Sequence, residues 1–310
     1  MKSPSGRGEA RTSDSGARWL PVCLILLQNT LYGFGDPISK AAYEVLPVYS
    51  LLSVRYLIAL VFLLLFFGRR IIRGLRVCTW RDWLAPSLCM GGAYLLGNIA
   101  LEMTAATSVA FLRSLSTVMT PLLALALFRR KLGRKRIPVM LLTVAGLYLL
   151  CGRGGLSRFG PGEVFALLTA LLLSGSLIFG EHALDRVDPM TLTAMQTLSS
   201  VVLAFLFAGV FEQGLHLGAA KPVHWAIIVY LALLCTVAGY LLQNMALGSL
   251  SSRTVALLQC MCPVMTALFS RLLLGETLSL PGILGAAILL FCVAAETLMT
   301  DDGPAVPSRQ

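Results

Sequence analysis

The chain contains a series of apolar segments, each about as long as the roughly 20-residue helix that crosses a bilayer. There are ten of them: 19–38, 47–68, 83–102, 106–128, 137–153, 162–180, 190–211, 224–247, 252–274 and 280–299. Only 13% of the residues are charged, about half of the share in soluble domains. The sequence therefore predicts an all-α membrane protein with ten transmembrane helices, of which 137–153 is the shortest.

The basic residues gather in alternate connections between these segments. With a cytoplasmic N-terminus, 18 of the 25 lysines and arginines fall in cytoplasmic segments and five in external loops, as the positive-inside rule requires. The clusters RRIIRGLR at 69–76 and FRRKLGRKR at 128–136 contribute most. They could also bind anionic lipid, but loop anchoring accounts for them. We expect both termini in the cytoplasm and a bacterial inner membrane as the location.

The remaining composition predicts neither a cofactor nor a nucleic-acid partner. The net charge of +10 is explained by the cytoplasmic loops, and the eight cysteines lie mostly inside apolar runs without zinc-site spacing. The polar tails 1–18 and 300–310 are predicted to be disordered. The partners expected are a small-molecule substrate and the lipid bilayer, and the sequence does not indicate the oligomeric state.

One stretch of the sequence occurs twice. AYLLGNIAL at 93–101 returns as GYLLQNMAL at 239–247, and from 94 to 132 fifteen of 39 positions match the residue 146 positions later. This offset moves a segment by five spans, an odd number, so the second copy is inverted in the membrane. Inverted repeats are typical of secondary transporters that bind substrate near the midplane. We predict two inverted five-helix repeats, 19–153 and 162–299.

Several motifs in these repeats resemble the EamA-type transporters of the drug/metabolite transporter superfamily. They include Tyr32-Gly33 followed by Lys40, and Arg55 in SVRYLIAL. The strongest is the stretch 251–290 with Pro263 and a Gly-Glu turn at 275–276. The resemblance implies export or exchange of a small metabolite, without naming the substrate.

The first half departs from this family pattern at two positions. Thr117 stands where the second half has Pro263, and arginines at 129–130 replace the Gly-Glu turn. The two halves are therefore not expected to contribute equally to a binding site.

Arg113 is the leading candidate for substrate contact. It lies seven residues into its segment, about 10 Å below the membrane surface. An arginine at the membrane centre costs about 2.5–3.5 kcal/mol, so the side chain should face a partner or water. Polar residues share its face: Ser116, Thr117 and Thr120. Its guanidinium suits a carboxylate or phosphate; the equally weighted alternative is a structural ion pair with Asp36 or Glu102.

Polar stripes on other segments supply further candidates. Tyr94, Asn98 and Glu102 follow one another at helical spacing, and Tyr240 and Asn244 repeat the first two. Gln259 occupies the position equivalent to Arg113. Each of these residues alone could simply hydrogen-bond a neighbouring helix, but as symmetric pairs they are candidates for substrate binding.

The first segment carries Gln28, Tyr32 and Asp36 at helical spacing. Its GFGDP stretch at 33–37 is predicted to interrupt the helix, which membrane proteins tolerate where a cavity is lined. Gln28 and Tyr32 are assigned to substrate binding, whereas Asp36, Lys40 and Glu102 are assigned to gating or coupling. The alternative for the Asp36–Lys40 pair is an exposed ion pair at a frayed helix end.

Together these features predict a secondary transporter for a small organic metabolite, such as an amino acid, that works by alternating access. The alternative is a non-transporting scaffold or regulatory subunit that retains the fold. The sequence has neither a nucleophile–base pair nor a phosphate-binding loop, and its three histidines lie at the ends of spans or in loops. We therefore do not expect an enzyme.

Overall fold

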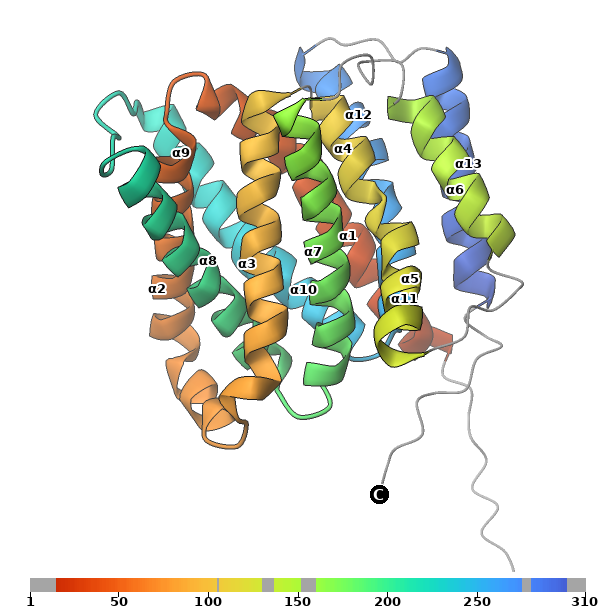
Figure 1. Ribbon diagram of the computed structural model, residues 1–310, viewed down its shortest axis with the longest axis horizontal. Helices are drawn as coiled ribbons and strands as arrows, with labels where there is room; N and C mark the ends of the chain where they lie inside the picture. The colour runs from red at the N-terminus through yellow and green to blue at the C-terminus, as the bar shows by residue number, and fades with distance from the viewer. Residues whose placement is uncertain (1–14, 105, 130–136, 152–159, 275–279, 300–310) are drawn as a thin grey trace, which may run out of the picture.

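The computed structural model describes residues 15–104, 106–129, 137–151, 160–274 and 280–299, and these residues are helical with short connections. The first half contains α1 (Ser15–Tyr43), α2 (Val48–Leu75), α3 (Trp80–Met103), α4 (Ala106–Ser114), α5 (Ser116–Phe128) and α6 (Ile137–Cys151). The second contains α7 (Pro161–Ala183), α8 (Pro189–Phe211), α9 (Pro222–Tyr230), the π-helix η3 (Leu231–Ala238), α10 (Gly239–Leu247), α11 (Ser252–Leu258), the 3₁₀ turn η4 (Gln259–Met261), α12 (Cys262–Leu274) and α13 (Leu280–Met299). This arrangement confirms the all-α fold class (Figure 1).

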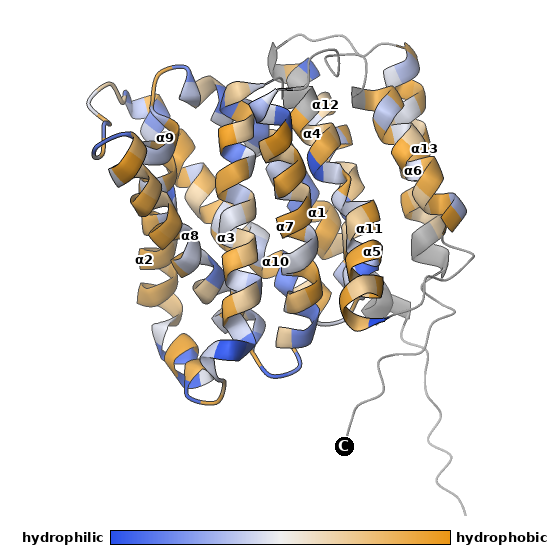
Figure 2. Ribbon diagram, viewed as in Figure 1, coloured by the Kyte–Doolittle hydropathy of each residue, from blue (hydrophilic) through white to orange (hydrophobic). Residues whose placement is uncertain are grey.

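Seven of the described helices, some built from consecutive elements, are long and apolar enough to cross a membrane, and α6 and α13 are shorter apolar helices. Hydrophobic residues cover the sides of the bundle, and hydrophilic residues gather toward its two ends (Figure 2). α1 is 29 residues long but is not among the seven, and it carries buried Gln28 and Asn29. The count of ten crossings therefore stays a prediction.

Helices related by the 146-residue offset pack against each other. α2 packs on α8, and α6 packs on α13. Equivalent residues also meet: the rings of Tyr94 and Tyr240 lie 5.2 Å apart, and the thiol of Cys260 lies 3.9 Å from the carbonyl of Ser114. These contacts place a pseudo-two-fold axis between the repeated stretches.

The contact between α6 and α13 follows the same symmetry. A Cβ added at Gly285 would lie 2.5 Å from the carbonyl oxygen of Gly146, so a side chain larger than hydrogen does not fit. The symmetry-related contact joins Cys292 to the carbonyl of Val139 at 3.8 Å. Small residues allow membrane helices to approach this closely.

Both repeats interrupt a helix at the same place. α4 gives way to α5 at Leu115, and η4 ends at the equivalent Met261. In the second half Pro263 lacks an N–H and cannot bond the carbonyl four residues earlier. In the first half Thr117 replaces that proline. Its hydroxyl donates to the carbonyl of Ala256 at 3.0 Å and contacts the sulfur of Cys260 in η4, so the two interruptions contact each other.

The predicted interruption of the first helix at GFGDP was wrong, because α1 is continuous through Pro37. Its glycines allow close packing instead. A Cβ at Gly33 would lie 2.5 Å from Cβ of Met265, and one at Gly35 would lie 2.7 Å from Sγ of Cys235. The glycines thus bring α1 against α12 and η3.

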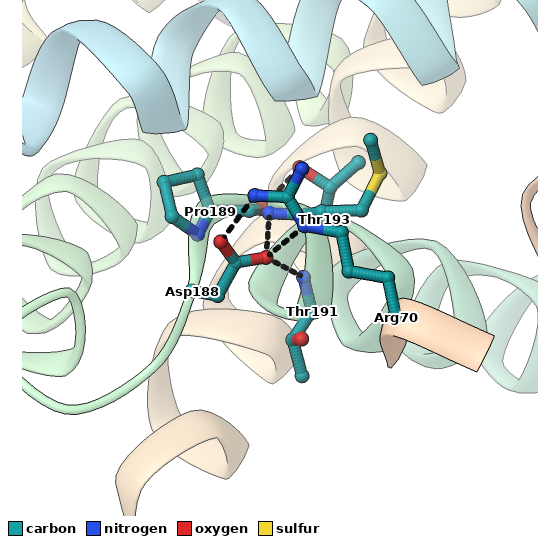
Figure 3. A network of polar contacts seen from close by, with 6 residues as sticks. Arg70, Asp188, Pro189, Thr191 and Thr193 are labelled. Atoms are coloured by element: carbon teal, nitrogen blue, oxygen red, sulfur yellow. Dashed lines mark hydrogen bonds and ion pairs between the residues drawn. The ribbon is translucent and has the colours of Figure 1, made fainter. Parts of the chain in front are cut away.

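Ion pairs join the two halves at the end of the bundle where α2 meets α3 and α7 meets α8 (Figure 1). Arg70 donates from Nη2 and Nε to the carboxylate of Asp188 at 2.6 and 3.2 Å. Asp188 also accepts from the backbone N–H groups of Met190 and Thr191 and caps α8 (Figure 3). A second pair connects Arg186 to Asp82 at 3.2 Å.

The opposite ends of α2 and α8 are joined as well. The carboxylate of Glu212 accepts hydrogen bonds from the backbone N–H groups of Tyr49 and Ser50 at 2.9 and 2.8 Å, and from the Ser50 hydroxyl. Because free N–H groups at a helix start require acceptors, Glu212 caps α2 from the other repeat.

Several predictions fall outside the described residues. They concern residues 1–14 and 300–310 of the two tails, the Gly-Glu turn at 275–276, and most of the basic cluster at 128–136. Residues 15–18 of the first tail form the start of α1.

Candidate functional site

A cavity lies among α1, α2, α3, α4, α7 and η3, and so draws its lining from both repeats. Its polar side chains include Tyr32, Asp36, Arg55, Tyr94, Asn98 and Arg113. The open space measures about 30 Å³, enough for one or two water molecules. Five of the eleven residues selected from the sequence thus meet here, all of them from the first repeat.

Arg113 and Asp36 form an ion pair in this cavity. Nη2 of Arg113 lies 2.6 Å from Oδ2 of Asp36, with the two side chains 20% and 22% exposed. The same nitrogen lies 3.6 Å from the thiol of Cys262. Of the two carboxylates considered as partners, Asp36 takes this role; Glu102 is exposed. The residue proposed for substrate contact therefore already has an opposing charge.

Lys40 lies beyond the cavity, at the end of α1. Its Nζ donates to the carbonyl of Thr104 at 3.3 Å, and the Thr104 hydroxyl donates to Glu163 of the second repeat. The expected Asp36–Lys40 ion pair is not formed among the described residues, because Asp36 faces Arg113 instead. Lys40 and Thr104 thus close this side of the bundle by a chain of polar contacts.

A tyrosine and an asparagine form the next wall of the cavity. Tyr43 donates its hydroxyl to Oδ1 of Asn98 at 2.6 Å, and Nδ2 of Asn98 donates to the carbonyl of Tyr94 at 2.7 Å. The rings of Tyr32 and Tyr94 lie 5.8 Å apart. The buried hydroxyl of Tyr32 has no hydrogen-bond partner among the described residues, and it lies against Gly239 of α10.

Arg55 is the charged lining residue that the sequence reasoning did not assign to the site. It is 4% exposed, Nε donates to the hydroxyl of Thr236 at 3.0 Å, and the guanidinium lies 5.3 Å from the centre of the Tyr56 ring. The signal was present in SVRYLIAL, where an arginine interrupts an apolar run. The same argument from insertion cost that singled out Arg113 applies to Arg55.

The candidates from outside this wall occupy different surroundings. Gln28, Gln243 and the partly buried Gln259 form a glutamine cluster, in which Gln243 accepts from Gln28 at 3.0 Å and from Gln259 at 2.8 Å. Asn244 donates to Thr193 and Gln196 of α8. Tyr240 contacts the Tyr94 ring but does not line the cavity.

The described residues contain no group of three or more histidine, cysteine, aspartate or glutamate side chains that could hold a metal ion. The cavity lining offers guanidinium, carboxylate, phenol and amide groups. These groups bind polar organic molecules through charge and hydrogen bonds.

Known proteins that resemble this chain are transporters by name. An uncharacterized transporter of Archaeoglobus fulgidus is 29% identical over 66% of this chain and 72% of that protein. The threonine/homoserine exporter RhtA of Salmonella typhimurium is 25% identical over 88% of each chain. Solute carrier family 35 member E4 of Rattus norvegicus is 32% identical over 68% of this chain and 61% of that protein.

Two further comparisons concern the whole chain. A solved crystal structure superposes with a TM-score of 0.73 at 19% identity, covering 93% of this chain and 99% of the other, which shows a shared fold. The EamA-like transporter family matches twice, over residues 19–152 and 160–295. The two matches coincide with the two predicted repeats, and the chain belongs to the EamA-like transporter family, as a multi-pass membrane transporter.

Proposed function

We propose that this transporter is a secondary transporter that exports or exchanges a small organic metabolite, such as an amino acid, by alternating access. We place it in a bacterial inner membrane with both termini in the cytoplasm, and assign 19–153 and 162–299 to the two moving halves. The name of the relative RhtA, a threonine/homoserine exporter, supports the amino-acid class.

The observation that carries this proposal is the charged cavity inside an apolar bundle. Arg55, Arg113 and Asp36 face one small space between the repeats. Ionisable groups inside a membrane protein are expensive and mark substrate pathways. The same space is lined by Tyr32, Tyr94 and the Asn98 amide, which suit the polar groups of a metabolite.

The size of the cavity supports a conformational cycle. Its open space of about 30 Å³ is far below the roughly 300 Å³ of a typical ligand pocket. Helices must therefore separate before a metabolite enters. The pair Arg70–Asp188 (Figure 3) and the pair Arg186–Asp82 join the halves at one end. We propose that both pairs break when the site opens on that side.

Transport by the purified protein tests this proposal. Proteoliposomes preloaded with single unlabelled amino acids should accumulate the labelled form by counterflow, which requires no knowledge of the coupling ion. Arg113→Gln should reduce this accumulation, whereas Arg76→Gln, an exposed arginine at the end of α2, should not. A folded protein that moves no amino acid, nucleoside or cationic dye would contradict the proposal and favour the scaffold.

A further inference from the structure

We propose that Arg55 binds the anionic group of the transported molecule, and that this group is a single carboxylate. The inference rests on the proposed function and adds a substrate class and its anchor. It starts from the difference between the two arginines in the cavity: Arg113 has the carboxylate of Asp36 at 2.6 Å, and no carboxylate lies within ion-pair distance of Arg55 among the described residues.

The hydrogen bonds of Arg55 leave most of its guanidinium unused. A guanidinium carries five N–H donors, and among the described residues the side chain of Arg55 makes one hydrogen bond, from Nε to Thr236. Both Nη groups are therefore without an acceptor in a side chain that is 4% exposed and lines the cavity. Two adjacent Nη donors match a carboxylate in geometry and charge.

The π-helix holds Arg55 in this orientation. The hydroxyl of Thr236 donates to the carbonyl of Leu231, five residues earlier, at 3.1 Å. That leaves a lone pair of the hydroxyl directed to Nε of Arg55. The Tyr56 ring lies against the guanidinium at 5.3 Å. Such π-helical turns are frequent at functional sites, and here the turn leaves the Nη edge free for a ligand.

The charge of the cavity favours a ligand that carries one carboxylate. Its charged lining residues are Arg55, Arg113 and Asp36, which leaves one surplus positive charge. A monocarboxylate without an amine neutralises this surplus, whereas a zwitterionic amino acid supplies the same carboxylate to Arg55 and leaves the net charge of the site unchanged. A phosphate monoester carries about 1.5 to 2 negative charges at pH 7 and would leave excess negative charge in a buried site. The apolar part of the molecule would face Leu101, Val109 and Leu173, which line the same cavity.

If Arg55 binds the ligand, removing its charge should have a distinctive effect on the apparent Tm of the ligand-free protein. Removing an uncompensated buried charge does not destabilise a protein, whereas breaking a buried pair does. Arg55→Gln should therefore have an apparent Tm in detergent equal to or above that of the wild type. A structural arginine would give the opposite result, a clear fall in Tm.

The transport test compares an acid with its neutral amide. Proteoliposomes are assayed for counterflow of labelled L-threonine, of the other proteinogenic amino acids and of small monocarboxylates without an amine. Matched amides and O-phospho-L-threonine are competitors. Arg55→Gln should raise KM for the acid by about 10- to 100-fold, from the loss of charge-assisted hydrogen bonds. Thr236→Val should raise KM less than Arg55→Gln does. Thr236→Ser keeps the hydroxyl and should have the KM of the wild type, as should the control Arg76→Gln.

The outcomes separate this inference from the proposed function. Three results together support the assignment. The wild type transports a carboxylate, neither the amide nor the phosphate ester inhibits this transport, and Arg55→Gln impairs it while the Tm is undiminished. Transport that Arg55→Gln leaves intact, or that the amide inhibits as well as the acid does, overturns the assignment and leaves the function standing. A folded wild type that moves cationic or neutral compounds and no carboxylate also overturns the assignment alone. Failure to move any compound overturns both.

Discussion

The residues at equivalent positions 113 and 259 of the two repeats differ in charge and in surroundings. In the first repeat Arg113 faces Asp36 across a cavity. In the second repeat the equivalent Gln259 lies in the glutamine cluster, where its amide donates to Gln243 at 2.8 Å and to Gln28 at 3.3 Å. One position is charged and lines a cavity, while the other is neutral and hydrogen-bonded to neighbouring side chains.

A single pair of positions explains much of this difference. Gly97 lines the cavity, and its counterpart 146 residues later is Gln243, which fills the space and joins the glutamine cluster. The two repeats thus share most of the course of their backbone, apart from the π-helix η3 in the second, and differ in the side chains at a few equivalent positions. The comparison predicts different responses to mutation on the two sides.

The largest effect is expected from breaking the ion pair of the first repeat. Asp36→Asn leaves Arg113 uncompensated in a largely buried site and should lower the free energy of unfolding by about 3 kcal/mol. The apparent Tm in detergent measures this. The double variant Asp36→Asn/Arg113→Gln should recover most of the loss. A single variant as stable as the wild type would show that the pair is unimportant.

The converse change makes the second repeat resemble the first. Gln259→Arg introduces a cation among glutamines and should cost about 2.5 kcal/mol, near the lower end of insertion costs for a central arginine. Adding Gln28→Glu supplies a carboxylate at the neighbouring position and should restore part of the Tm. If Gln259→Arg alone were neutral, the glutamine cluster would have to be open to water.

A smaller effect is expected inside the glutamine cluster. Gln243→Leu removes the acceptor for Gln28 and Gln259, and hydrogen bonds between membrane helices contribute about 0.6–1.7 kcal/mol. Thermal unfolding should detect the loss. Met245→Leu, at an exposed position of α10, is the matched control, and an equal effect of the two variants would argue against a structural role for the cluster.

The smallest effect is expected from replacing Arg70, which pairs with Asp188 of the other repeat. Arg70 is 60% exposed, so Arg70→Gln should cost about 0.2–1 kcal/mol. Asp188→Ala should cost more, by about 1 kcal/mol, because it also removes the N-cap of α8. Equal Tm values for the two variants would show that the cap contributes nothing.

The fold was largely predictable because helix length and the 146-residue offset are properties of the sequence alone. Lipid exposure requires long apolar segments, and an odd number of spans between copies requires inversion. The continuity of α1 was not predictable, because Gly33 and Gly35 act through Met265 and Cys235, which lie more than 190 residues away. Glycine in a sequence does not distinguish a break from close packing.

The candidate site was only partly predictable, for a related reason. Tyr32, Tyr94, Asn98 and Arg113 line the cavity, as charge and helical spacing suggested. Gln28 and Gln259 are as polar, but their amides bond one another. Whether a buried polar group faces a cavity or a partner depends on residues distant in sequence. The buried charge of Arg55 could have been noticed in the sequence, but the lack of a carboxylate partner among the described residues could not.

Substrate protection of a thiol tests the central claim most directly, because one of two equivalent cysteines lines the cavity and the other does not. Cys235 lines the cavity, and its counterpart Cys89 does not. In single-cysteine variants in proteoliposomes, a transported amino acid should slow modification of Cys235 by a small thiol reagent and leave modification of Cys89 unchanged. Equal rates at Cys235 with and without a saturating transported substrate would contradict binding in this cavity.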